Sequence, residues 1–168
     1  MIYPENVRKA AAADLPEVVR LFAGAIRRMD ENGIPQWDEI YPDEAILAED
    51  IAAGNMYVYI IGGRIAAVFV LNREFDPEYV KGDWRYPNSD FAVVHRLCVS
   101  TDFQHMGVAA SAMRAAEAIL KNGGVESIRL DAFPRNPYAI KLYEKLGYVK
   151  TGECDFRKGR FYLYEKKI

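Results

Sequence analysis

The segment from Thr101 to Ser111 carries residues whose types and spacing suit the binding of an anion. Gly107 stands near the start of a predicted helix, directly after an apolar run that predicts a strand. The first turn of a helix presents unpaired backbone N–H groups and a partial positive charge. Small residues there let a pyrophosphate approach the backbone, and Gln104 and His105 can add side-chain donors. The alternative is that Gly107 only eases the packing of the helix against the strand, and the phosphate motifs GxGxxG and GxxxxGK[ST] are both absent.

His95 and Cys98 bring two more reactive side-chain types into the apolar run 91–100. His95 alternates with Val93 and Leu97, so a strand puts these three residues on one side. An imidazole with an ordinary pKa near 6.5 suits proton transfer at neutral pH, whereas a structural histidine only completes a hydrogen-bond network. We expect Cys98 to be a buried, unreactive small hydrophobe, because no cation or helix N-terminus is evidently placed to favour its thiolate.

The whole chain has the composition of an ordinary globular protein. Its 168 residues fit one domain over residues 1–168, with 51% hydrophobic and 27% charged residues and a net charge of -2. That charge argues against nucleic-acid binding through bulk electrostatics. The longest apolar stretch is interrupted at Gly62 and Gly63, and the first residues lack a signal-peptide core, so we expect no membrane insertion and a cytoplasmic protein. With two histidines and no cluster at ligand spacing, we expect no metal.

The pattern of apolar residues predicts helices and strands in mixed order, separated by Gly and Pro. An order that mixes hairpins with strand–helix–strand units predicts an α/β fold with a mixed sheet and helices on both faces. The expected elements are a strand and a helix in 7–33 with Asp14 as N-cap, a loop and a helix in 34–55, a hairpin in 56–74, a long loop in 75–90, a strand in 91–100, a helix in 104–124, a strand in 126–133, a helix in 136–147 and strands in 148–154 and 160–168.

Two segments, 93–120 and 131–153, resemble the sequence motifs of one enzyme superfamily. They are similar to the [QR]xxGx[GA] and NxxAxxLYxxxGF motifs of the GNAT acyl-CoA-dependent N-acyltransferases. His105 stands where Arg or Lys is common, and Tyr148 stands where Phe is more usual. The matching residues are Gln104, Gly107 and Ala109 in the first motif, and Asn136, Ala139, Leu142, Tyr143, Gly147 and Tyr148 in the second.

The resemblance implies a GNAT-type N-acyltransferase fold. In that fold a mixed central sheet is flanked by helices and opens in a V between the strand in 91–100 and the strand in 126–133. It also implies acetyl-CoA as co-substrate, with its pyrophosphate at the first motif and its pantetheine along the strand before it. The residues implied in cofactor binding are Leu97, Cys98, Val99, Gln104, His105, Met106, Gly107, Val108, Ala109 and Asn136.

The resemblance further implies transfer of the acetyl group to a primary amine of a small molecule or peptide, by direct attack in a ternary complex. Tyr143 is then expected to protonate the departing sulfur; the alternative is a core tyrosine. Some members of the superfamily have Glu or His near the position of His95, which makes His95 the expected base. The alternative function is a non-catalytic module that binds or senses acyl-CoA.

The acceptor side offers weaker signals. Trp37 lies among acidic and aromatic residues in a predicted loop, an arrangement that favours a cationic amine through charge pairing and cation–π contact. Trp37 can also simply fix the loop to the core. Finally, the alternation of apolar residues in 160–168 leaves an edge strand to which a second copy can add, so a homodimer is one expectation.

Overall fold

The strands form one twisted sheet whose two faces are covered by different segments. The computed structural model describes residues 4–168, and within them the sheet has seven strands in the order β1-β2-β3-β4-β5-β7-β6. Only β4 and β5 run parallel, so the sheet is mixed as predicted. The strands are β1 (Val7–Lys9), β2 (Met56–Ile61), β3 (Arg64–Asn72), β4 (Phe91–Val99), β5 (Ser127–Ala132), β6 (Val149–Phe156) and β7 (Gly159–Lys167).

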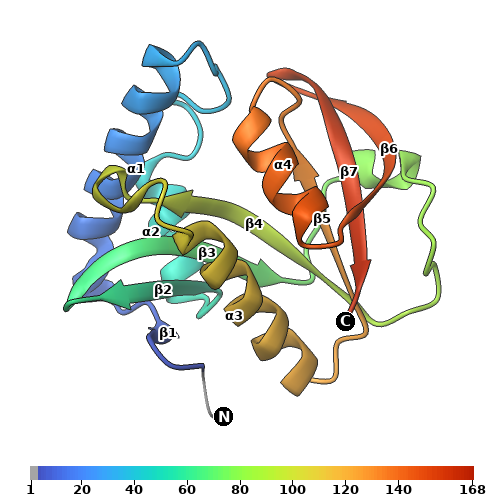
Figure 1. Cartoon of the computed structure of the whole chain (residues 1–168), viewed down its shortest axis with the longest axis horizontal. Helices are drawn as coiled ribbons and strands as arrows, with labels where there is room; N and C mark the ends of the chain where they lie inside the picture. The colour runs from blue at the N-terminus through green and yellow to red at the C-terminus, as the bar shows by residue number, and fades with distance from the viewer. Residues whose placement is uncertain (1–3) are drawn as a thin grey trace.

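Helices lie on both sides of this sheet (Figure 1). Successive side chains of a strand point to opposite faces of the sheet, so both faces carry apolar side chains that must be covered. The apolar faces of the helices cover them. The α-helices are α1 (Leu15–Glu31), α2 (Glu44–Ala52), α3 (Val108–Asn122) and α4 (Pro137–Lys145), and the short 3-10 turns are η1 (Ala12–Asp14), η2 (Pro77–Lys81) and η3 (Thr101–Phe103).

Three apolar clusters divide the core. Met113 of α3 is fully buried in the cluster that holds Phe69, whereas Phe22 of α1 is buried with Val68, the preceding residue of β3. The third cluster holds Val93 of β4, Cys154 of β6 and Phe161 of β7. The loop between β3 and β4 buries Tyr79 in the same cluster, which also holds Leu163.

Side chains cap two of the α-helices in the described part of the chain. The Asn136 side chain accepts a hydrogen bond from Ala139 N at 3.1 Å, and Asp43 caps α2 in the same way. Asp14 was predicted to cap α1, but its carboxylate instead accepts from Ala11 N at 2.7 Å and pairs with Arg8. The reason is that Asp14 itself has helical backbone angles, as the last residue of η1, so its side chain turns back to the start of that turn.

The parallel strands β4 and β5 separate part of the way along their length. They pair only from Phe91 with Ser127 to Val93 with Arg129, although β4 continues to Val99. A bulge in β4 follows, in which Arg96 takes a left-handed φ of 52° and the register with β3 shifts. The expected V-shaped opening between these strands is therefore present.

The predicted edge strand is not at the edge. β7 pairs with β5 on one side and with β6 on the other, so residues 160–168 lie inside the sheet and β6 forms its boundary. Part of β6 is itself covered, because Asp83 N donates to Thr151 O at 2.8 Å. Alternation in the sequence predicted the strand correctly, but it carries no information on which neighbours the strand has.

No helix of residues 4–168 combines the length and apolar character needed to cross a membrane.

Candidate active site

The turn before α3 has the backbone shape that an anion site requires. His105 has φ of 61° and Gly107 has φ of 76°, so two left-handed residues flank Met106. No side chain of the described residues caps α3, and a Cβ atom placed at Gly107 would meet no other atom within 4 Å. The space beside Gly107 is thus open, next to the first turn of the helix, whose N–H groups have no intrahelical acceptor.

A cavity of about 620 Å³ lies where β4 and β5 separate. Its walls come from the loop between α1 and α2, the loop between β3 and β4, the middle of β4, the end of β5, α4 and the turn between β6 and β7. Four of the predicted site residues line it: Trp37, His95, Leu97 and Tyr143. The others, Cys98, Val99, Gln104 to Ala109 and Asn136, lie outside its lining.

Tyr143 reaches the cavity from α4. Its side chain is buried, and its ring packs near those of Tyr148 and Tyr164 at centroid distances of 5.8 and 6.2 Å. Within residues 4–168 its hydroxyl makes no hydrogen bond. Burial, helped by the nearby charge of Asp131, raises its pKa well above the ordinary value of 10. Tyr143 is thus a protonated hydroxyl at the wall of the cavity, as well as a member of the core.

His95 reaches the cavity from β4 with a defined tautomer. Its Nε2 lies 2.9 Å from Asn72 Oδ1 and 3.1 Å from Glu74 O. The Asn72 oxygen also accepts from Glu74 N, so both partners of Nε2 are acceptors and Nε2 carries the proton. Burial and the neighbouring charge of Arg96 lower the pKa of His95 from 6.5 to about 4. The ring is therefore neutral at pH 7, and its pKa differs from the ordinary value assumed from the sequence.

Asp131 is a charged group of the cavity that the sequence analysis did not single out. It lies on β5, and the Tyr79 hydroxyl donates to its Oδ2 at 2.7 Å. Burial is the main reason that its pKa rises from 3.8 to about 6, and the charge of Asp76 adds to the rise. Among the described residues it has no ion-pair partner. The available signal was an acid inside the apolar run of residues 126–133, which is the same kind of signal that identified His95.

Arg96 was also missed, and no local pattern could have identified it. Its Nε and Nη2 bind the Asp50 carboxylate at 2.8 and 2.7 Å, and its Nη1 donates to the Tyr41 hydroxyl at 2.6 Å. Asp50 lies 46 positions earlier, on α2. This buried pair neutralises the charge of Arg96 and ties the bulge of β4 to α2.

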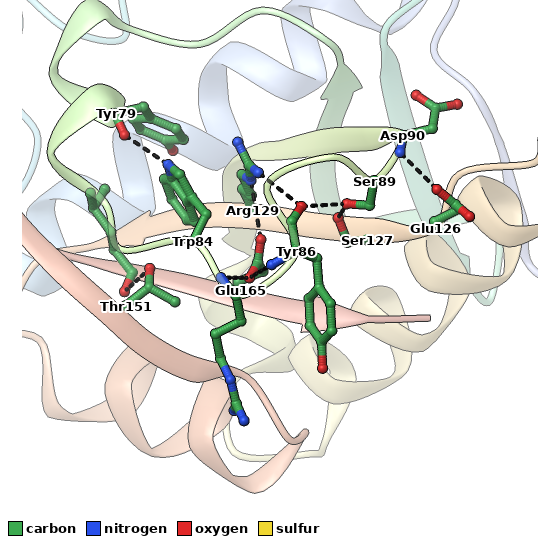
Figure 2. A network of polar contacts seen from close by, with 12 residues as sticks. Tyr79, Trp84, Tyr86, Ser89, Asp90, Glu126, Ser127, Arg129, Thr151 and Glu165 are labelled. Carbon is green, nitrogen blue, oxygen red and sulfur yellow. Dashed lines mark hydrogen bonds and ion pairs between the residues drawn. The ribbon is translucent and has the colours of Figure 1, made fainter.

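Buried polar contacts fix the loop between β3 and β4 onto the sheet (Figure 2). Glu165 of β7 is fully buried and accepts from Arg85 N at 2.8 Å, from Tyr86 N at 3.2 Å and from Arg129 Nε at 3.2 Å. The Arg129 guanidinium lies 4.3 Å from the centre of the Trp84 ring. Because this loop also carries Asp76 and Tyr79, the network determines where the loop meets the cavity.

Trp37 and the turn between β6 and β7 close the cavity on its remaining sides. Trp37 is 9% exposed and its ring packs 5.4 Å from that of Phe22, so it belongs to the core while lining the cavity. The adjacent Asp38 binds both Arg157 and Lys158, and these contacts hold its pKa well below the ordinary range. Asn136 joins the same loop to α4, since its amide donates to Gln36 Oε1 at 2.9 Å.

Cys98 is buried, and its burial raises the pKa of its thiol far above the ordinary value of 9. It is therefore a protonated, unreactive thiol at neutral pH. In the part of the chain that the structure describes, no three side chains of His, Cys, Asp or Glu come together as a metal site would require.

Comparisons with known proteins agree with this geometry. The model of the Acetyltransferase (GNAT) family matches residues 24–148. The chain is 25% identical over 162 residues to the S-(2-succino)cysteine N-acetyltransferase of Bacillus subtilis strain 168, an alignment that covers 95% of this chain and 93% of that protein.

Two solved structures show the same fold. The crystal structure of a GNAT-family acetyltransferase from Streptococcus agalactiae 2603 aligns with a TM-score of 0.88 at 21% identity, covering 100% of this chain and 98% of that one. The PaiA N-acetyltransferase from Thermoplasma acidophilum, in complex with coenzyme A, aligns over the full length of both chains with a TM-score of 0.74 at 17% identity.

Proposed function

The chain belongs to the GNAT acetyltransferase family, and on that premise we propose that it moves the acetyl group of acetyl-CoA directly to a primary amine of a small molecule. It is an acyltransferase, and acetyl-CoA is the acetyl donor of its family. The observation that carries the proposal is the cavity, which brings Tyr143, His95 and Asp131 together where β4 and β5 separate.

The donor side is proposed to use mainly backbone groups. The N–H groups at the start of α3, from Gly107 to Ala109, would bind the pyrophosphate, with Gln104 and His105 beside them. The part of β4 beyond Val93 has no β5 partner, so its backbone can pair with the pantetheine and polarise the thioester carbonyl. Asn136, at the start of α4, is proposed to contribute to the binding of acetyl-CoA.

The acid of the reaction is proposed to be Tyr143. The amine nitrogen attacks the thioester carbon, a C–N bond forms, the C–S bond breaks, and the leaving thiolate takes the hydroxyl proton. The raised pKa of Tyr143 keeps that proton on the hydroxyl over the whole physiological range. The absence of a hydrogen bond from its hydroxyl to any described residue leaves the group available to the substrate.

The base is proposed to be Asp131 rather than His95. Before attack the acceptor must lose an ammonium proton, and a base works best with a pKa near the operating pH. The pKa of Asp131 is about 6, whereas that of His95 is about 4, so Asp131 lies closer to neutral pH. We propose that His95 shapes the cavity through its neutral ring, and that Trp37 contacts the acceptor.

The acceptor is proposed to be a small molecule rather than a protein. The name of the Bacillus subtilis relative supports this class, and a cavity of about 620 Å³ has the size of a small-molecule site.

Release of free thiol from acetyl-CoA in the presence of an amine panel tests the proposed function. Tyr143→Phe is expected to lower kcat by about 100-fold or more, the size of a general-acid effect, while leaving the Kd of acetyl-CoA within twofold. The matched control is Tyr148→Phe, a neighbouring buried tyrosine whose hydroxyl binds Glu117 outside the cavity. Binding of acetyl-CoA without thiol release on any acceptor would favour the non-catalytic module instead.

A further inference from the structure

The charged residues around the cavity are divided by sign between its two ends. Glu74 and Asp76, on the loop after β3, and Asp131 on β5 make one end acidic. Arg157 and Lys158, in the turn between β6 and β7, make the other end basic.

Ion pairing does not cancel this division. The charge of Arg96 is neutralised by Asp50, but none of the three acids has an ion-pair partner among residues 4–168. At the basic end, the two cations share the single carboxylate of Asp38, so two positive charges against one negative leave an excess of one. The basic end also continues outward, because both cations line a second cavity of about 500 Å³ whose other charged residues are Arg135, Arg160 and Glu153, and Glu153 pairs with Arg160 alone among these cations.

The sheet register gives the separation of the two ends. Asp131 pairs with Leu163 of β7, and β7 begins at Gly159, directly after Lys158. Four strand residues span about 13 Å at ~3.3 Å each. Long side chains on the turn shorten this gap without closing it. A ligand that uses both ends must therefore carry its two charges several bonds apart.

We propose that the acceptor is an amine with a carboxylate several bonds from its nitrogen, bound with the nitrogen at Asp131 and the carboxylate at Arg157 and Lys158. This inference rests on the proposed function, since it identifies the class of acceptor. The chemistry matches at both ends, because guanidinium and ammonium groups bind carboxylates through charge-assisted hydrogen bonds and an acid pairs with the ammonium. Arg157 and Lys158 then act as specificity residues, far from the reacting atoms.

The test compares linear ω-amino acids of increasing length with their amides and with the plain alkylamines. Thiol release from acetyl-CoA gives kcat/KM, and calorimetry with CoA present gives the affinity of each compound without turnover. The acids of suitable length are expected to exceed their amides at least tenfold in both measurements, and added salt should reduce the difference. Equal use of acids and amides, or a preference for alkylamines, would overturn the proposal.

Variants separate binding from a merely structural role of the turn. Arg157→Gln and Lys158→Gln are each expected to lower kcat/KM about tenfold for the acids and to leave the amides within twofold. An equal loss on acids and amides would mean that Arg157 acts only by holding Asp38, and would count against the proposal. Arg8→Gln is the matched control: its side chain is 48% exposed against 49% for Arg157, it also binds an aspartate through both of its Nη atoms, and it lines neither cavity.

The design distinguishes the two proposals. Acid-selective binding without thiol release from any amine would retain this inference and overturn the proposed function. Thiol release with amines that lack a carboxylate, together with no selective binding of the acids, would retain the proposed function and overturn this inference. The comparison of acids with amides on the unmodified protein decides the matter even where a variant does not fold.

Discussion

The proposed donor site lies in the turn beyond the end of β4, the proposed acceptor cavity is lined by the middle of β4, and the two are built in opposite ways. The turn before α3 is one contiguous segment whose shape comes from backbone angles at His105 and Gly107. The cavity is built from side chains of segments far apart in the sequence, held by ion pairs such as that between Arg96 and Asp50. A site built from backbone is specified by a short motif, whereas a site built from side chains depends on the whole fold.

The two constructions also differ in how they fail. A carboxylate removed from a buried pair leaves an uncompensated charge, and that cost is spread through the fold. A change in a surface turn costs mainly local strain. Damage to the donor site should thus appear in acetyl-CoA binding with moderate loss of stability, and damage to the supports of the cavity should appear in stability and in use of the acceptor.

The largest expected effect tests the support of the cavity. Glu165→Leu leaves the Arg129 charge and two backbone N–H groups without their acceptor, so the free energy of unfolding should fall by about 3–5 kcal/mol in urea denaturation. Glu153→Leu on β6 is the control, because its pairs with Lys150 and Arg160 are exposed, so its free energy of unfolding should change far less.

The kinetics of Glu165→Leu also test whether the two proposed sites are built independently. If enough Glu165→Leu folds, the KM of the acceptor should rise while the Kd of acetyl-CoA stays within twofold, since the loop lines the cavity through Asp76 and contributes no residue to the turn before α3. A larger loss of acetyl-CoA affinity than of acceptor use would show that the two sites are not built independently. Glu165→Gln provides the same test with a smaller loss of stability.

The next effect tests the donor site. Gly107→Val puts a β-branched residue at a φ of 76°, a strain of roughly 1–2 kcal/mol, and adds bulk where the phosphates are proposed to lie. The Kd of acetyl-CoA, measured by calorimetry, is expected to rise at least tenfold. Gly62→Val is the matched control, because Gly62 has φ of 56° and open space around it in the distant hairpin between β2 and β3. Unchanged acetyl-CoA binding in Gly107→Val would refute the assignment of this turn.

The smallest effect concerns pH. As a base, Asp131 must be ionised, so kcat/KM should increase as pH rises through about 6, and Asp131→Asn should lower kcat/KM and abolish that limb. The groups that tune this carboxyl are Tyr79, Asp76 and Arg96. His95→Asn should retain the limb, since the pKa of His95 is about 4. If the rise of kcat/KM with pH disappeared in His95→Asn and persisted in Asp131→Asn, the base would be His95 instead of Asp131.

Stability should follow the same group with a defined sign. The folded pKa of Asp131 lies above the unfolded value of 3.8, so the folded state favours the protonated form. This contribution to stability is present below about pH 4 and is lost as pH rises through about 6. The stability of Asp131→Asn relative to the parent should therefore increase across that window, even though the variant is the poorer enzyme.

The contrast between the two sites explains what the sequence could predict. The order of strands and helices and the glycine turn depend on neighbours within a few positions, so local patterns revealed them. Arg96 and Asp131 gained their roles from partners such as Asp50 and Tyr79, which lie 46 and 52 positions away. The position of β7 inside the sheet likewise depends on pairing that alternation does not encode.

The attachment of the loop between β3 and β4 leads to one more consequence. Arg85 and Tyr86 give Glu165 their backbone N–H groups, and Asp83 gives its own to a carbonyl of β6. Peptide groups are common to all residues, so these fastenings leave the side chains of residues 74–78 open to exchange. Substitutions of Glu74 and Asp76 are therefore expected to change which molecules the cavity accepts, without altering the attachment of the loop or the turn before α3.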